Sequence, residues 1–419
     1  MGDDQYIRRI VDVELAEQLE AMGAVLVEGP KWCGKTRTSL EASKSAFYVS
    51  RQRALAMDLP DVALSGETPR LIDEWQLVPK LWDHARAIID ERSEPGQFVF
   101  TGSVVPEDAK PVHSGAGRFA RVTMRALSLY ESGESNGTVS LAALFDGDSV
   151  APQETALPAI SDLAWALVRG GWPASLRLSK DAAARIPRNY LDAIENADVE
   201  FIEDESIAWD KIKIRLLLRS LARVSGQGVN LSKTVEDVRS QTGILTRKTA
   251  AYYVNALKRL FVIEDQPVWR ASLRSRAILR ETPKRHFIDP SLAAAALGAS
   301  AGRLLQDHAT LGLLFETLCY RDLNVYAQPI GGQLYHYKDS SGHEIDNIVV
   351  LPDGRWAAIE VKLGDTFLEN AAANLASVKE RINAESVGDL AFMAILYAGR
   401  YAYMRRDGIQ VVPIGCLGP

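Results

Sequence analysis

The segment GPKWCGKT, from Gly29 to Thr36, stands between a short apolar run and a predicted helix. Its order of glycine, four residues, glycine, lysine and threonine is the pattern of a phosphate-binding loop. Residues 24–27 are apolar and rich in valine, which predicts a buried strand, and residues 37–43 predict the first turns of a helix. A strand, a glycine-bearing loop and a helix N-terminus together direct backbone N–H groups at phosphate oxygens. The segment therefore predicts a nucleotide site, although a glycine-rich turn without a ligand is the alternative.

The side chains of this loop predict binding of ATP together with Mg²⁺. Lys35 is expected to reach the β- and γ-phosphates, and the Thr36 hydroxyl is expected to bind Mg²⁺. The residues expected to contact the nucleotide are Gly29, Pro30, Lys31, Trp32, Cys33, Gly34, Lys35, Thr36, Arg37, Thr101 and Ser103. Cys33 is either an oxidisable thiol in the loop or a small filling residue.

A second signal is the run LIDEWQ, Leu71–Gln76, in which an apolar strand ends in two acids. Asp73 is expected to hold the Mg²⁺ shell, and Glu74 is expected to polarise the attacking water as general base. The next predicted strand ends near Thr101 and Ser103, which either sense the γ-phosphate or belong to an ordinary turn. About forty residues after a phosphate loop, these acids indicate a nucleotide hydrolase.

Strands that alternate with helices predict a doubly wound parallel α/β domain over residues 1–150. In such a sheet the ligand lies at the carboxyl ends of the strands. Arg118 lies in the loop HSGAGRF, residues 113–119, before another predicted strand. It is either an arginine finger for a neighbouring subunit, which predicts a homo-oligomer, or a surface arginine.

The amino-acid composition limits the class of protein but does not identify a binding partner. At 419 residues and a net charge of −6, the chain predicts about three domains. No apolar run approaches the ~18 residues that a membrane span needs. Asp3 and Asp4 stand where a signal segment would be basic, so we expect a cytoplasmic protein. Three widely spaced cysteines argue against disulfides and zinc.

The middle of the chain predicts a helical linker or lid over residues 151–210. Residues 131–160 are rich in Gly, Ser, Asp and Pro and predict a loop or linker, and residues 182–204 have a helical pattern. A helix before Gly170-Gly171 ends at Arg169, which either reaches back to the nucleotide or packs internally.

Residues 211–290 predict a basic, winged-helix module. This segment holds 17 Lys and Arg against 6 Asp and Glu, a net charge of +11, so the rest of the chain carries −17. Such asymmetry indicates an anionic partner. Three predicted helices, over residues 216–224, 231–240 and 246–260, precede an arginine-rich wing. The residues expected to contact DNA are Arg247, Lys248, Arg270, Arg274 and Arg276. The alternative is a winged helix used for protein packing.

Residues 291–419 predict a nuclease-like α/β domain of the restriction-endonuclease type. Asp346 lies on one predicted strand, and Glu360 and Lys362 share one face of the next strand because they are two residues apart. Carboxylates arranged in this way suit Mg²⁺, and Glu316 on a helix upstream is a further candidate ligand. Lys362 would position the attacking water. An exposed hairpin with alternating charge is the alternative.

These motifs resemble those of a bacterial group of ATP-binding proteins. That group pairs an AAA+-like ATPase of the AAA_14 type with a C-terminal region called DUF4143. The resemblance rests on the motifs already quoted and on FTGS (Phe100–Ser103), RGGWP (Arg169–Pro173), EID (Glu344–Asp346) and EVK (Glu360–Lys362). It implies phosphate and Mg²⁺ contacts for Lys35 and Thr36 and a PD-(D/E)xK nuclease fold at the C-terminus. In place of the family's sensor asparagine stands Thr101 or Ser103.

Three functions follow from these patterns. The first is an oligomeric ATP hydrolase that couples nucleotide state to a DNA-contacting and nuclease-like region. The second is a metal-dependent DNA nuclease that ATP regulates. The third is a nucleotide-switched interaction module in which the nuclease fold is inactive.

Overall fold

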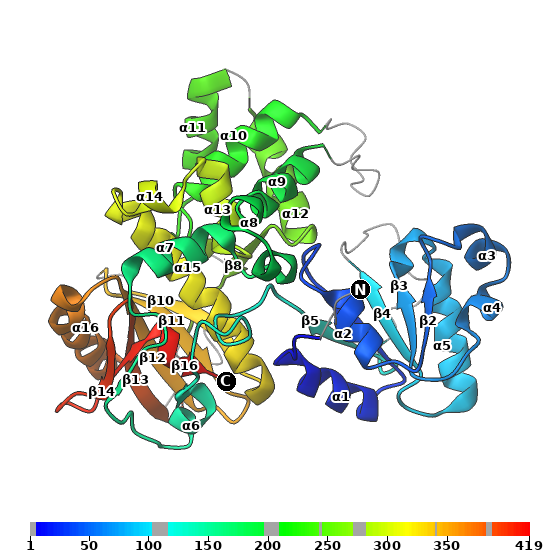
Figure 1. Ribbon diagram of the computed structural model, residues 1–419, viewed down its shortest axis with the longest axis horizontal. Helices are drawn as coiled ribbons and strands as arrows, with labels where there is room; N and C mark the ends of the chain where they lie inside the picture. The colour runs from blue at the N-terminus through cyan, green and yellow to red at the C-terminus, as the bar shows by residue number, and fades with distance from the viewer. Residues whose placement is uncertain are drawn as a thin grey trace. The chain divides into compact units, whose positions relative to one another are not determined.

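A computed structural model describes most of the chain (Figure 1). The described residues are 6–102, 116–196, 209–242, 245–270, 282–339, 342–382 and 388–419. They form two compact units: most of the first lies before Ala126, and most of the second lies after Leu127. The four-part division expected from the sequence stays a prediction.

The first unit contains a five-stranded, all-parallel sheet in the order β2-β3-β4-β1-β5. Its strands are β1 (Ala24–Glu28), β2 (Ser45–Tyr48), β3 (Arg70–Asp73), β4 (Phe98–Gly102) and β5 (Phe119–Thr123). Its helices are α1 (Val11–Ala21), α2 (Lys35–Glu41), α3 (Arg53–Asp58), α4 (Pro60–Leu64) and α5 (Lys80–Arg92). Parallel strands joined by helical crossovers confirm the predicted α/β class of this unit.

The central strands β1 and β4 are buried, and they are mostly apolar because helices cover both faces of a parallel sheet. Alternate residues of β1 point to opposite faces. Leu26 packs in the core that contains Trp82 of α5, and Val25 packs in the core that contains Leu15 of α1. The ring of Trp82 stacks on Phe119 with centroids 3.8 Å apart. Helices therefore cover both faces, and the carboxyl edge of the sheet stays available for a site.

The second unit contains a seven-stranded mixed sheet in the order β10-β11-β12-β13-β15-β14-β7. Its strands are β7 (Gln153–Glu154), β10 (Gln333–Lys338), β11 (Glu344–Val350), β12 (Trp356–Lys362), β13 (Leu390–Tyr397), β14 (Tyr401–Met404) and β15 (Gln410–Pro413). The pairs β10–β11 and β11–β12 are antiparallel, and β12 pairs with β13 in parallel. The crossover between β12 and β13 contains α16 (Leu368–Arg381), whose apolar face packs on the sheet.

Two further strand pairs and a set of helices complete the second unit. The pairs are β6 (Val139–Ser140) with β16 (Leu417–Gly418), and β8 (Ile263–Gln266) with β9 (Lys284–Phe287). The helices are α6 (Leu141–Phe145), α7 (Ile160–Arg169), α8 (Lys180–Ala183), α9 (Ile186–Glu195), α10 (Lys211–Ala222), α11 (Leu231–Thr242), α13 (Pro290–Leu297), α14 (Ala301–Leu304) and α15 (His308–Ala327). Helix α12 (Arg247–Arg259) belongs in part to each unit.

The expectation that residues 131–160 form only a loop or linker is wrong. Strand β6 pairs with β16 and strand β7 pairs with β14, so this segment joins the sheets of the second unit. Each of these strands has two residues, and such short strands show no alternation that a sequence pattern can detect. Their pairing partners lie more than 240 residues away along the chain.

Candidate nucleotide site and acidic cluster

The phosphate loop connects β1 to α2 at the carboxyl edge of the first sheet. Gly29 and Gly34 have φ angles of 150° and 104°, a region that favours glycine. A Cβ atom at Gly29 would lie 2.1 Å from the carbonyl oxygen of Met124, so the turn leaves no room for a side chain. Trp32 also has a positive φ of 63° and is exposed. The loop thus needs both glycines to enter the helix.

Lys35 is buried within this loop. Its Nζ donates to the carbonyl oxygens of Gly29 at 2.8 Å and Pro30 at 2.7 Å. Both acceptors are uncharged carbonyls, which a phosphate oxygen can replace as the stronger, charge-assisted acceptor. The ammonium is therefore held inside the loop, where a bound phosphate would meet it.

Two hydroxyl groups converge on Asp73. The hydroxyls of Thr36 and Thr101 each donate to Asp73 Oδ1 at 2.7 Å. Thr101 is opposite Asp73 because β3 and β4 pair in register, and Thr36 lies in the first turn of α2. A carboxylate and a hydroxyl at this edge are hard oxygen donors, which suit Mg²⁺. These residues therefore fit the predicted Mg²⁺ position.

Glu74 follows Asp73 in a left-handed conformation, with φ 58° and ψ 46°. This conformation is costly for a residue other than glycine, by about 1–2 kcal/mol. The backbone N–H of Glu74 donates to Thr101 Oγ1 at 3.3 Å, and its carboxylate accepts from Gln76 Nε2. The turn and the amide together hold the Glu74 carboxylate, as expected for a positioned base. The sequence contained Gln76 in the quoted LIDEWQ run, but its type alone did not indicate this contact.

Arg9 is a residue of this site that the sequence did not reveal. Its side chain is buried, and its guanidinium donates to the carbonyl oxygens of Cys33 at 2.9 Å and Arg125 at 2.8 Å. Arg9 thus joins the phosphate loop to the chain after β5. No spacing rule could have indicated it, because the contact with Arg125 spans 116 residues.

Arg118 lies at the opposite edge of the sheet from the phosphate loop. Its carbonyl oxygen accepts from Ala24 N at 3.0 Å, at the start of β1, whereas the loop begins after the end of β1. Four residues of strand separate these edges, which corresponds to roughly 13 Å. The guanidinium pairs with Asp90 at 2.7 Å and lowers the pKa of that carboxyl. Arg118 therefore does not reach the phosphate loop of its own sheet.

The remaining residues predicted to bind nucleotide have varied surroundings. Arg37 pairs with Glu41 at 2.7 Å on the surface of α2. Cys33 is buried and Lys31 is exposed. Ser103 lies outside the described residues, as does the 113–115 part of the loop before Arg118.

Arg169 is a packing residue of the second unit. It is buried, and its guanidinium donates to both carboxylate oxygens of Glu134, including Oε1 at 2.9 Å. The adjacent Gly171 N–H donates to Asp289 at 3.0 Å. Of the two alternatives, the structure supports internal packing.

A second constellation lies in the second unit, where α15, β11 and β12 bring together the predicted acids. Asp346 Oδ2 accepts from the backbone N–H of Val361 at 2.9 Å, and Lys362 contacts both Asp346, at 3.5 Å, and Glu360. Lys284 of β9 enters the same cluster. Across the residues that the structure describes, no group of three or more His, Cys, Asp or Glu side chains is arranged to hold a metal ion.

Electrostatics assign different states to these carboxyl groups. Burial raises the pKa of Glu360, and the neighbouring Asp346 raises it further. Burial likewise raises the pKa of Glu316. Burial alone would raise the pKa of Asp346, but the ammonium groups of Lys284 and Lys362 outweigh it and hold this pKa low. Among Glu316, Asp346 and Glu360, Asp346 is therefore the firmly ionised carboxylate.

The predicted DNA-contacting residues are only partly described. Arg247 and Lys248 are exposed in the first turn of α12. Arg270 is half-buried. Arg274 and Arg276 lie outside the described residues.

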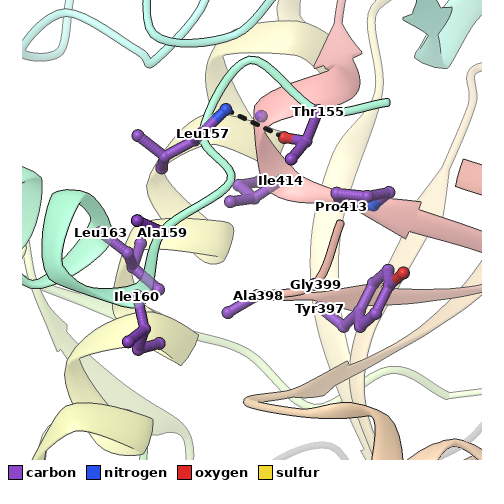
Figure 2. Close-up of a pocket in the computed structure, with 11 residues that line it drawn as sticks. Thr155, Leu157, Ala159, Ile160, Leu163, Tyr397, Ala398, Gly399, Pro413 and Ile414 are labelled. Carbon is purple, nitrogen blue, oxygen red and sulfur yellow. Dashed lines mark hydrogen bonds between the residues drawn. The ribbon is translucent and has the colours of Figure 1, made fainter. Parts of the chain in front are cut away.

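A small pocket of the second unit has none of the predicted site residues in its lining (Figure 2). Its wall includes Tyr397, Ile414 and the turn in which Leu157 N–H donates to Thr155 Oγ1 at 3.1 Å. The lining contains no charged side chain, so it offers no chemistry to the predicted reactions. Within the described part of the chain, no helix is long and apolar enough to cross a membrane.

Comparison with known proteins adds family matches to this geometry. Residues 22–133 match an AAA domain (AAA_14), residues 160–303 match a domain of unknown function (DUF8612), and residues 311–417 match another (DUF4143). The AAA match contains the phosphate loop, Asp73 and Glu74, which supports an AAA-like ATPase. The predicted resemblance to AAA_14 and DUF4143 is thereby confirmed, whereas DUF8612 was not foreseen.

Similar whole proteins exist in mycobacteria. Over 418 residues the chain is 25% identical to an uncharacterized protein of Mycobacterium tuberculosis and to one of Mycobacterium bovis. Each alignment covers 97% of this chain and 83% of the relative. A Walker-type ATPase of Pyrococcus abyssi aligns in structure with a TM-score of 0.42 and 12% identity, over 70% of this chain and 97% of that one.

Proposed function

We propose that the first unit binds ATP with Mg²⁺ and hydrolyses it. The observation that carries this proposal is the convergence of Thr36 and Thr101 on Asp73, beside the loop that encloses Lys35. Hydroxyl, carboxylate and ammonium are the groups that a nucleotide hydrolase needs at one edge of a sheet. The AAA-domain match over the same residues supports this proposal.

Each residue has a defined task in this proposal. Lys35 exchanges its two carbonyl partners for phosphate oxygens, and the loop amides bind the remaining oxygens. Thr36 and Asp73 would hold Mg²⁺, which when bound neutralises charge on the β- and γ-phosphates. Glu74 accepts a proton from the attacking water.

Phosphate release tests the proposal directly. Lys35→Ala and Glu74→Gln should each lower the rate at least about a hundredfold, because each removes a charged group at the reacting phosphate. Lys44→Ala is the matched control, since Lys44 is an exposed lysine of the same unit. Equal release by the wild type and Lys35→Ala would refute the proposal.

We further propose that the active form is a homo-oligomer in which Arg118 serves a neighbouring nucleotide. Arg118 lies at the edge of the sheet that faces away from its own phosphate loop, and it is partly exposed. A rate per subunit that rises with protein concentration would support this arrangement. A rate that is constant with concentration, from a monomer of measured mass, would contradict it.

A second proposed activity is contact with DNA through a winged-helix module. Helices α10, α11 and α12 precede the paired strands β8 and β9, which is the element order expected for such a module. The exposed Arg247 and Lys248 and the net charge of +11 favour an anionic partner. Replacing both residues by alanine should lower the slope of binding against salt by about two. Binding to a DNA duplex that does not weaken between low and high salt would exclude this contact.

We also propose a nuclease-type architecture for the DUF4143 region. Helix α15, the antiparallel strands β10, β11 and β12, helix α16 and the parallel strand β13 follow in the order expected for it. In such an architecture Glu316, Asp346 and Glu360 stand at the positions where metal ligands are expected, with Lys362 beside them.

A further inference from the structure

The acidic cluster of the second unit already contains a cation of its own. We define the cluster by its carboxylates, Glu316, Glu344, Asp346 and Glu360. Lys284 Nζ lies 2.7 Å from Glu316, 3.0 Å from Glu344 and 3.1 Å from Asp346. Its side chain is only 3% exposed, so the ammonium has left water for these three carboxylates. We propose that Lys284 takes the position of a divalent cation and that the DUF4143 region neither binds Mg²⁺ nor cuts nucleic acid.

The charges of this cluster leave no place for a second cation at the same point. A divalent ion that bound Glu316 and Asp346 together would lie within roughly the length of a metal–oxygen bond from each. The ammonium already bridges these two carboxylates at hydrogen-bond distance. Two positive charges so close repel strongly where water is excluded. Metal binding therefore requires Lys284 to leave.

Neighbouring contacts make that departure costly. Lys284 lies on β9, and the next inward residue of this strand, His286, shares a hydrogen bond of 3.0 Å with Gln266 Oε1 of β8. Gln266 Nε2 in turn donates to Asn347 Oδ1 at 3.0 Å and to the carbonyl oxygen of Asp346 at 2.9 Å. The buried side chains here are those of Lys284, His286, Gln266 and Asn347. The paired strands β8 and β9 are thus fixed to the acidic cluster through several polar contacts, and Lys284 cannot leave alone.

The other lysine completes the same pattern. Lys362 contacts Glu360 and Asp346, and Asn374 Nδ2 donates to the remaining Glu360 oxygen at 2.8 Å. The predicted ligands Asp346 and Glu360 are therefore engaged by groups of the chain itself. It follows from the proposal that this cluster is an internal ion network, which joins the basic module to the C-terminal sheet. This conclusion does not depend on the proposed ATP hydrolysis.

The experiment measures Mn²⁺ binding to the full chain by electron paramagnetic resonance, without nucleotide. Every variant carries Asp73→Asn, which removes the charge of the predicted metal position in the first unit. This background chain should hold no Mn²⁺ that depends on Glu360. Adding Lys284→Met should tighten Mn²⁺ binding at least about tenfold, because it removes a buried like charge. A further Glu316→Gln substitution should abolish the new site, because Glu316 is a direct partner of Lys284.

Two matched variants control for general effects. Lys284→Arg keeps a cation in place and should create no site. Lys338→Met removes an exposed lysine that contacts Glu344 from the rim, at 3.0 Å, and should also create no site. A gain of Mn²⁺ binding with Lys338→Met alone would show that net charge, and not occupancy, controls binding, and would overturn the proposal.

Three further results decide the matter. If the background chain binds Mn²⁺ and loses it with Glu360→Gln, the proposal is wrong. If folded Lys284→Met binds no Mn²⁺, Lys284 does not hold the position of the metal, and the proposal is again wrong. If Lys284→Met does not fold, the wild-type chain is incubated with plasmid DNA and Mn²⁺: intact plasmid supports the proposal, and cleavage that Glu360→Gln abolishes refutes it.

Discussion

Replacing Gln76 by leucine should slow ATP hydrolysis while leaving nucleotide affinity intact. Gln76 is 6% exposed, and its Nε2 donates to the carboxylate of Glu74. Among the described residues, its other amide atom, Oε1, has no hydrogen-bond partner, so the substitution removes one side-chain bond. A hydrogen bond to a charged group contributes about 1.5–3 kcal/mol. Since about 1.4 kcal/mol corresponds to tenfold in rate, we expect kcat to fall about ten- to a hundredfold.

The assay is steady-state phosphate release over a range of ATP concentrations. KM should stay near the wild-type value, because the partner of Gln76 Nε2 is the carboxylate of Glu74, the proposed base, and not a group of the phosphate loop. Gln76→Glu should lower kcat further, since it places a second carboxylate against Glu74. Gln52→Leu, at an exposed glutamine of the same unit, is the control and should have no effect.

A double-mutant cycle separates positioning from packing. In a Glu74→Gln background, Gln76→Leu should cause little further loss, because the group that it positions is already gone. A folded Gln76→Leu protein with kcat within about twofold of the wild type would refute the reasoning. An equal loss in both backgrounds would show that Gln76 acts through the fold instead.

Three further substitutions probe the remaining contacts. Thr101→Val removes the hydroxyl that donates to Asp73 at 2.7 Å. It should destabilise the first unit by about 2–4 kcal/mol in denaturant unfolding. The rate of hydrolysis should also respond more weakly to Mg²⁺. Arg118→Ala should lower kcat at least about a hundredfold in the assembled protein, and unchanged kcat would exclude a finger role. Arg169→Met should destabilise the second unit by about 3 kcal/mol, because it removes the cation partner of the Glu134 carboxylate. KM for ATP should stay constant, and a raised KM would indicate nucleotide contact.

Local patterns predicted the strands and the loop of the candidate nucleotide site well, because its groups lie at strand ends and in one loop. The spacing of residues 29–36 gives the turn, and the acids that end β3 meet the loop at the edge where parallel strands carry ligands. The bounds of β1 and α2 differ from the expected ones by one or two residues. What the sequence could not show is how Gln76 and Arg9 support this site. Each acts through a hydrogen bond whose geometry depends on tertiary packing.

In the second unit, by contrast, the sequence predicted the acidic residues but not the cation that lies between them. Strand alternation correctly placed Asp346 and Glu360 on neighbouring strands, and helical periodicity placed Glu316 on α15. The ammonium between them comes from β9, more than 30 residues before Glu316 and more than 60 before Asp346. In the sequence, Lys284 was one of 17 basic residues of a segment predicted to face DNA. A motif identifies possible ligands, but only packing shows which cation they surround.

Lys35 and Lys284 are both buried, but they differ in the charge of the groups that would lose a partner if the ammonium moved away. Lys35 bonds two neutral carbonyl oxygens, so an arriving phosphate replaces acceptors that keep no net charge. Lys284 neutralises carboxylates, and its departure would leave buried, unpaired anions, which costs about 3–5 kcal/mol. An ion that displaces Lys284 must first overcome that cost, whereas a nucleotide that engages Lys35 meets no comparable penalty. Lys35 can therefore exchange its partners, as the proposed hydrolysis requires, whereas Lys284 joins β9 to the strand and helix that carry its carboxylate partners.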